Sequence, residues 1–179
     1  MSELDEAWTL ALAEAKARAR AAGRTDVSEY LALRSANDLI RKVASEWLLS
    51  LFVRAAGEAN RAGGAINIST DDPHRFKVGN ATMVGQRLNL GNGVRMLTVE
   101  VGWPRAPRDG FIRGGGLACG HIKHRGIKSA NEELRLMLRA DRTPIWIAEG
   151  KHERHLEFHE GDIKKHIAIL LDDSRNKRS

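Results

Sequence analysis

The stretch "VRMLTVEVGW", residues 94–103, carries apolar side chains at every second position from Leu97 to Trp103. A period of two is typical of a β-strand that buries one face in a core. One face of this strand carries Leu97, Val99, Val101 and Trp103, and the other carries Met96, Thr98 and Glu100. We therefore expect a sheet with one face in the core.

The same period occurs in three segments before it: "AINIST" (65–70), "HRFKV" (74–78) and "TMVGQRLNL" (82–90). The connecting segments "DDP", "GN" and "GNG" are typical turns, and connections this short allow only antiparallel pairing. Further strands are expected within "LACGHIKH" (117–124), "PIWIA" (144–148) and "HLEF" (155–158).

The first third of the chain predicts helices. One helix ends before Gly23, and a second runs from about Asp26 to Ala62 with one candidate break near Ser35. Apolar pairs recur every four residues along the second helix, at Leu39/Ile40, Val43/Ala44, Trp47/Leu48 and Leu51/Phe52. We expect this stripe to cover the sheet, with Trp47 and Leu51 buried beneath it.

The last third predicts a terminal helix and one ambiguous segment. The helix begins at Asp162 as its N-cap, and one face carries Ile163, His166, Ile167, Leu170 and Leu171. In residues 129–141, "SANEELRLMLRAD", a capping box and strong helix formers favour a helix. Leu134, Leu136 and Leu138 also alternate as in a strand. We expect a helix and leave the strand open.

These elements predict an α+β fold with two layers: an antiparallel sheet of about five to seven strands packed against long N-terminal helices and a C-terminal helix. We expect a single domain over residues 1–173, followed by a frayed tail at 174–179. Within it, residues 1–62 are helical, 63–128 form the basic antiparallel sheet, and 129–173 are mixed.

Composition indicates a globular protein: 42% of the 179 residues are hydrophobic and 29% are charged. The single cysteine, Cys119, excludes a disulfide framework and a multi-cysteine zinc site. The start "MSELDEAW" lacks the pattern of a secretory signal, and the longest apolar run, "WLLSLFV" (47–53), is too short to span a bilayer. We expect a cytoplasmic protein with no membrane association.

The net charge of +6 is concentrated in the middle of the chain. Residues 63–131 hold 10 Lys and Arg against 4 Asp and Glu, whereas both flanking thirds are balanced. Six of these cations lie in or beside a glycine-rich region with Trp103 and Phe111 between them: Arg105, Arg108, Arg113, Lys123, Arg125 and Lys128. The favoured function is an accessory protein that binds nucleic acid or another phosphoanion, without a cofactor.

The glycines of "RGGGLACG" (113–120) do not match a dinucleotide or P-loop motif, so we interpret them as a bend. Cys119, among apolar neighbours, is interpreted as a buried, unreactive thiol.

A nuclease is the second candidate function. In "PIWIAEGK", Glu149 and Lys151 follow an apolar strand, as in the E-x-K half of a nuclease site that holds Mg²⁺. Asp141, Glu132 or Glu133 are candidates for a second acid. Whether the protein is an enzyme at all stays open.

The stretch "IAEGKHERHLEFHEGD" (147–162) also offers His155, Glu157 and His159 on one strand face as metal ligands. Because alternate strand residues stand nearly 7 Å apart, we favour a solvent-exposed rim instead.

A third candidate is an interaction subunit. Its first helix, carrying Trp8, would dock a protein partner or a second copy of the chain.

Overall fold

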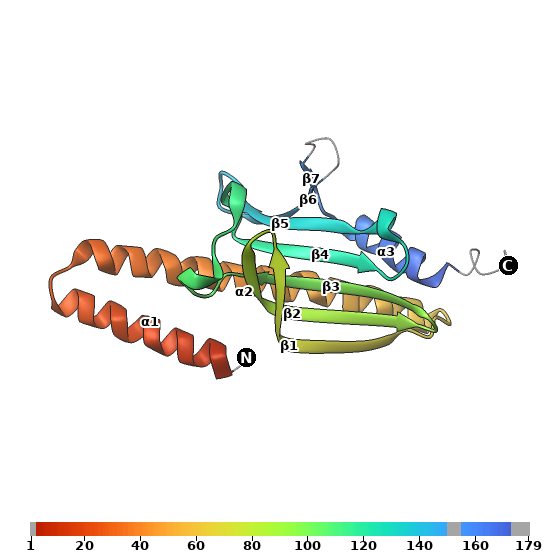
Figure 1. Ribbon diagram of the computed structural model, residues 1–179, viewed down its shortest axis with the longest axis horizontal. Coiled ribbons are helices and arrows are strands. Elements are labelled where there is room, and N and C mark those ends of the chain that lie inside the picture. The colour runs from red at the N-terminus through yellow and green to blue at the C-terminus, as the bar shows by residue number, and fades with distance from the viewer. Residues whose placement is uncertain (1–2, 150–154, 173–179) are drawn as a thin grey trace. The chain divides into compact units, whose positions relative to one another are not determined.

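The computed structural model describes residues 3–149 and 155–172. Within this range the chain forms three α-helices and one seven-stranded antiparallel sheet, which confirms the α+β prediction (Figure 1). The chain divides into two compact units at Val43/Ala44, and helix α2 (Thr25–Arg61) contributes to both.

The first unit is a helical hairpin made of α1 (Glu3–Ala21) and the beginning of α2. The turn between them uses Gly23 at φ 66°, a conformation that glycine adopts without steric cost. The indole of Trp8 donates to Asp38 over 3.0 Å, and the guanidinium of Arg34 lies 4.7 Å from the indole ring. Trp8 therefore already packs against the neighbouring helix.

Helix α2 is continuous through Ser35, so the predicted break there is wrong. A serine inside a helix costs only a few tenths of a kcal/mol relative to good helix formers, and its neighbours continue the helix.

The sheet of the second unit is a meander in which each strand pairs with the next in sequence, in the order β1 to β7. Its strands are β1 (Asn67–Val78), β2 (Ala81–Asn92), β3 (Arg95–Trp103), β4 (Ala118–His124), β5 (Glu132–Leu138), β6 (Pro144–Glu149) and β7 (His155–Glu157). Short turns between most strands account for this order, as the sequence predicts.

Two strand predictions need correction. The segments 65–70 and 74–78 belong to one strand, β1, because "DDP" forms an irregularity in the pairing with β2 between Asp71 and His74 rather than a turn. The helix expected at 129–141 is also wrong: residues 132–138 form β5. Leu134 and Leu136 are buried in the core, and β5 hydrogen-bonds to β4 and β6 on its two sides. Pairing on both edges outweighs the local helix preference.

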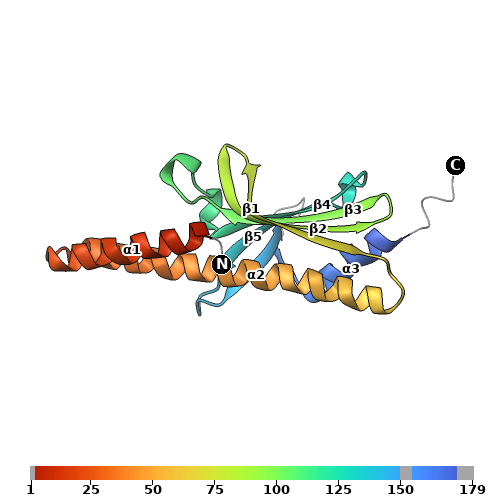
Figure 2. The same cartoon turned by 90° about the horizontal axis from the view of Figure 1, so that it is seen from below.

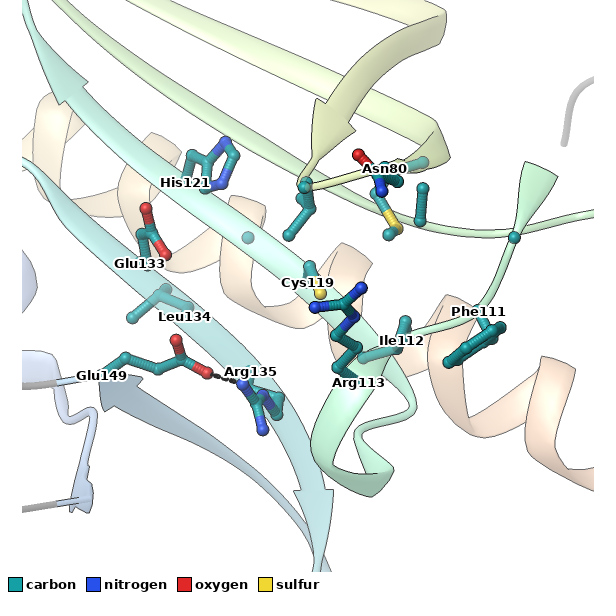
Figure 3. A pocket seen from close by; sticks show the side chains of 16 residues that line it. Asn80, Phe111, Ile112, Arg113, Cys119, His121, Glu133, Leu134, Arg135 and Glu149 are labelled. Carbon is teal, nitrogen blue, oxygen red and sulfur yellow. Dashed lines mark ion pairs between the residues drawn. The ribbon is translucent and has the colours of Figure 1, made fainter. Parts of the chain in front are cut away.

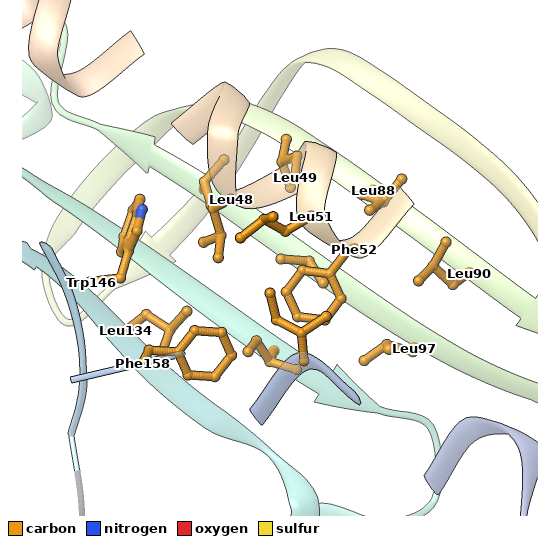
Figure 4. Close-up of a cluster of buried hydrophobic side chains, with 14 of the residues drawn as sticks. Leu48, Leu49, Leu51, Phe52, Leu88, Leu90, Leu97, Leu134, Trp146 and Phe158 are labelled. Atoms are coloured by element: carbon orange, nitrogen blue, oxygen red, sulfur yellow. The ribbon is translucent and has the colours of Figure 1, made fainter. Parts of the chain in front are cut away.

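The core lies between one face of the sheet and two helices: α2 from Ala44 onward, and α3 (Glu160–Leu171) (Figure 2). Phe52 and Leu48 are fully buried over the sheet (Figure 4). The predicted inner face of β3 is confirmed, because all four of its apolar residues belong to this core: Leu97, Val99, Val101 and Trp103.

The stripe predicted on α2 is only partly buried. Leu51 is 9% exposed, whereas Trp47 is 53% exposed and Leu39 and Val43 are exposed as well. The expectation that Trp47 is buried is therefore wrong. The apolar pairs occupy a wide band of the α2 surface, and the core covers only part of that band.

Helix α3 begins three residues earlier than predicted. His159 occupies the N-cap, and Asp162 lies at the third helical position, where its carboxylate accepts the backbone N–H of His159 over 3.0 Å. An acid at this position satisfies an N–H at the helix start and favours the positive end of the helix dipole.

A buried histidine pair joins α3 to the sheet. His124 Nε2 and His166 Nδ1 are 2.9 Å apart, and both side chains are almost fully buried. Burial, followed by the neighbouring His166, lowers the pKa of His124 from 6.5 to about 4, although Glu132 acts in the opposite direction. The neutral form of His124 is thus the one that the fold accommodates.

None of the described helices is both long enough and apolar enough to cross a membrane.

The first prediction concerns the core. Phe52→Ala should lower the free energy of unfolding by about 3–5 kcal/mol, because a fully buried ring leaves a cavity against the sheet. Trp47→Ala should cost less than about 1 kcal/mol, because much of its side chain contacts solvent. Chemical denaturation measures both, and equal losses would contradict this account of the α2 face.

The second prediction concerns His124. Because its pKa is lower in the folded than in the unfolded chain, the unfolded state binds the extra proton as the pH falls from 6.5 to about 4. Stability should decrease over that window, by about 3 kcal/mol from this group. Urea unfolding at a series of pH values should show a smaller decrease in His124→Asn than in the parent. A decrease in His124→Asn equal to that of the parent would contradict this account of His124.

Candidate functional site

The face of the sheet opposite α2 and α3, here called the open face, carries a second apolar cluster. Phe76, Ala81, Met83 and Cys119 are buried there, and Val78 and Ile112 pack against them. A pocket of about 360 Å³, here called the open-face pocket, lies over this cluster (Figure 3). It is lined by the β1–β2 turn, by residues 110–113 of the β3–β4 loop, and by β4, β5 and the end of β6.

The β3–β4 loop, residues 104–117, is held in place by its own side chains. The buried carboxylate of Asp109 accepts the backbone N–H groups of Arg105 and Ala106 over 3.2 and 3.0 Å. The guanidinium of Arg105 lies 3.9 Å from the Trp103 ring and donates to the Val84 carbonyl over 3.4 Å. Arg105 thus fixes the start of the loop.

The glycines of the loop allow the backbone to bend, as the sequence predicts. Gly114 and Gly115 have φ of 76° and 80°, and a short 3₁₀ turn spans Arg113–Gly115. A Cβ atom on Gly114 or Gly116 would collide with the side chain of Arg135. The missing side chains therefore let Arg135 lie across the loop.

Arg135 forms an ion pair with Glu149 at one side of the pocket (Figure 3). Glu149 is the carboxylate of the nuclease hypothesis; its proposed partner Lys151 lies outside the described residues.

Of the candidate second acids, Glu133 lines the same pocket as Glu149. Glu132 lies 3.7 Å from His166, and Asp141 accepts the backbone N–H of Thr143 over 2.9 Å. Among residues 3–149 and 155–172, no three His, Cys, Asp or Glu side chains are grouped so as to hold a metal ion.

A buried carboxylate at the centre of the open face is the feature that sequence analysis missed. Glu100 is 5% exposed and contacts three basic side chains. His74 Nε2 lies 2.6 Å from Oε2, Lys123 donates to Oε1, and His121 Nδ1 lies 3.5 Å from Oε1. Burial alone would raise the pKa of Glu100, but contacts with His121, Lys123 and His74 outweigh it and hold the pKa well below its usual range.

The sequence indicated the strand faces of only two members of this cluster, Glu100 and His121. The alternation of 94–103 places Glu100 on the outer face, and that of 117–124 places His121 on one face of its strand. His74, however, reaches Glu100 from β1, two strands away in the sheet, and no local pattern relates the two.

The structure divides the six predicted cations between two ends of β4. Arg105, Arg108 and Arg113 belong to the loop before it, whereas Arg125 and Lys128 follow it. A seven-residue strand separates the groups by roughly 20 Å. Lys123, in between, is paired with Glu100.

Only one of the two interleaved aromatics is accessible. Phe111 is 76% exposed, whereas Trp103 is 5% exposed and lies in the core.

The three predicted metal ligands differ in their surroundings. Glu157 pairs with Arg139, and His159 is the N-cap of α3. The side chain of His155 lies outside the described residues.

Cys119 is buried in the floor of the pocket. Burial raises the pKa of its thiol to about 11, partly offset by the charge of Arg135. At neutral pH the residue is therefore a thiol rather than a nucleophilic thiolate.

No protein-family model, curated protein or solved structure matches this chain.

The third prediction concerns Glu100. Glu100→Gln should lower the free energy of unfolding at pH 7 by about 3 kcal/mol, because a buried charge network loses its only anion. Asp71→Asn is the matched control, since Asp71 also pairs with a cation, Arg87, on the open face but is 46% exposed. It should cost less than about 1 kcal/mol. Denaturant unfolding measures both, and equal effects would mean that Glu100 is an ordinary surface acid.

Proposed function

We propose that the protein binds a phosphoanion at the open-face pocket, and that its ligand is a single-stranded nucleic acid. The observation that carries the proposal is the pair Phe111 and Arg113: an exposed aromatic ring and an exposed guanidinium, two residues apart, line the same pocket.

Arg113 supplies the charge. Among residues 3–149 and 155–172, none pairs with its guanidinium, whereas Lys123 is held by Glu100 and Arg135 by Glu149. A guanidinium offers a planar set of donors that matches two oxygens of a phosphate. Arg113 is therefore the pocket cation that is ready for a ligand.

Phe111 supplies the stacking surface. An exposed phenyl ring on a loop contributes little to the stability of the fold. The same ring stacks on any nucleic-acid base, and such stacking contributes about 1–3 kcal/mol per base. A pocket of about 360 Å³ is at the small end of the range for ligand sites and suits one nucleotide unit. The base would stack at the rim while a phosphate reaches Arg113.

The remaining loop cations suit neighbouring phosphates of the same strand. Arg108 is exposed on the same loop, which Asp109 and Arg105 hold in position before any ligand binds. Pre-organisation of this kind reduces the entropy lost on binding. The surplus of basic residues in 63–131 favours an anionic partner over a neutral one.

The fourth prediction tests this site with a fluorescein-labelled deoxythymidine oligonucleotide, which has bases and phosphates but no 2′-hydroxyl. Arg113→Ala should weaken binding about tenfold and reduce the dependence of log affinity on log salt by about 0.7, which is one phosphate contact on a single strand. Phe111→Ala should weaken binding by a similar factor without changing the salt dependence, because stacking is uncharged.

Arg75→Ala is the matched control, since Arg75 is an exposed cation on β1 next in sequence to His74 and hence on the opposite face of the sheet. It should have little effect in fluorescence anisotropy. Equal losses from Arg75 and Arg113 would indicate diffuse attraction to a basic protein, and no binding near physiological salt would refute the proposal.

A further inference from the structure

Three polar residues form a row across the centre of the open face. In the strand register Glu100 is opposite His121, and His121 is opposite Glu133, so the row crosses β3, β4 and β5. Neighbours across a sheet on one face lie about 5 Å apart, within reach of each other's side chains. His121 is the middle member, and both it and Glu133 line the open-face pocket.

The two sides of the His121 ring have different surroundings. Nδ1 is buried, makes no hydrogen bond of normal length, and lies 3.5 Å from Oε1 of Glu100. Because Nδ1 faces the carboxylate, Nε2 is the ring nitrogen left for a ligand. A carboxylate close to an imidazole stabilises the imidazolium that forms when Nε2 accepts a proton.

Burying an ionised carboxylate on an outer sheet face is costly, and the cost is offset only by its three basic neighbours. His74 contacts Oε2 and Lys123 contacts Oε1, and together they hold Glu100 so that Oε1 stays 3.5 Å from Nδ1 of His121. Clusters of this kind beside a pocket are typical of sites that transfer protons.

The position of His121 relative to Arg113 determines which part of a bound nucleotide His121 can reach. In Figure 3 the Arg113 guanidinium lies next to Cys119 of the pocket floor in this view, and the His121 ring lies further along β4. Residues 119 and 121 are about 7 Å apart along β4. A phosphate held by Arg113 would therefore present the adjoining sugar, rather than the phosphorus itself, to His121.

We propose that the protein cleaves RNA, with His121 as the general base that removes the proton from a ribose 2′-hydroxyl. This inference rests on the proposed function, because Arg113 and Phe111 must first bind the strand. In RNA the nucleophile belongs to the substrate, so the site has to supply only a base and a positive charge beside the phosphate.

The reaction balances without a further reagent. His121 Nε2 takes the 2′-hydroxyl proton, the 2′-oxygen forms a bond to the adjacent phosphorus, and the bond from phosphorus to the 5′-oxygen breaks. The leaving 5′-oxygen takes a proton from water, and His121 returns its proton to solvent. The products are a 2′,3′-cyclic phosphate and a 5′-hydroxyl.

Glu133 lies next to His121 in the strand register, on the side away from Glu100, and lines the same pocket. It is exposed, and among residues 3–149 and 155–172 no cation is paired with it. Its carboxylate is an acceptor for a ribose hydroxyl, a role that acidic side chains commonly have toward ribose. Glu133 is thus a positioning residue that favours RNA over DNA.

The fifth prediction uses the full chain, a labelled uridine oligonucleotide, and EDTA in the buffer. We expect cleavage to products ending in a 2′,3′-cyclic phosphate, identified by mass spectrometry, and none from the deoxythymidine oligonucleotide. His121→Ala should reduce kcat by about 100-fold or more with little change in KM, as expected for loss of a general base. Added imidazole should restore part of the rate, which a merely structural residue would not allow.

Glu133→Gln should raise KM more than it lowers kcat, and Arg75→Ala, prepared in parallel, should cleave like the parent. That control also reveals any contaminating ribonuclease, because contamination would give His121→Ala the same activity as Arg75→Ala. Such equality, or cleavage that disappears in EDTA, would overturn the inference.

Binding and cleavage separate the two proposals. If the deoxythymidine oligonucleotide binds through Arg113 and Phe111 but the uridine oligonucleotide stays intact, the catalytic inference is wrong and the binding function stands. If neither oligonucleotide binds and none is cleaved, both proposals are wrong.

Discussion

The alternation of apolar and polar side chains along β3 gives the sheet two different faces. Burying the four apolar residues of β3 under α2 and α3 fixes one face of the sheet as the core, and it sends Thr98 and Glu100 to the other face. Because every strand pairs with the next in sequence, the same division extends across all seven strands. Phe52 and Leu48 of α2 pack against the core face of the sheet. The open face is therefore available for polar and charged groups.

The open face is not a uniform polar surface. At the β1–β2 turn it carries a small apolar cluster around Met83, which forms the pocket floor together with the unreactive thiol of Cys119. Beside it, Glu100 remains ionised because His121, Lys123 and His74 compensate for its burial. An apolar floor next to a fixed charge network strengthens electrostatic interactions with a ligand, since apolar groups screen charges less than water does. The proposed roles of Arg113 and His121 both depend on this setting.

Sequence patterns predicted most elements, and their errors share a cause. Residues 132–138 have helix-forming side chains but form β5, because strands on both sides complete its hydrogen bonds. Trp47 matches the apolar period of α2 yet is exposed, because the core covers a narrower sector of the helix than the period implies. The six cations predicted as one site lie at two ends of β4, and Lys123 is engaged by Glu100. In each case a neighbour distant in sequence decides the outcome.

The fold class, the antiparallel pairing and the inner face of β3 follow from sequence patterns, because periodicity and short turns are properties of residues close in the chain. The same patterns located the loop that carries Phe111 and Arg113. Which polar groups meet depends on the three-dimensional arrangement of the strands. Strand register brings Glu100 opposite His121, and the path of β1 brings His74 to the same carboxylate. Such encounters depend on the pairing of whole strands, and no local pattern encodes them.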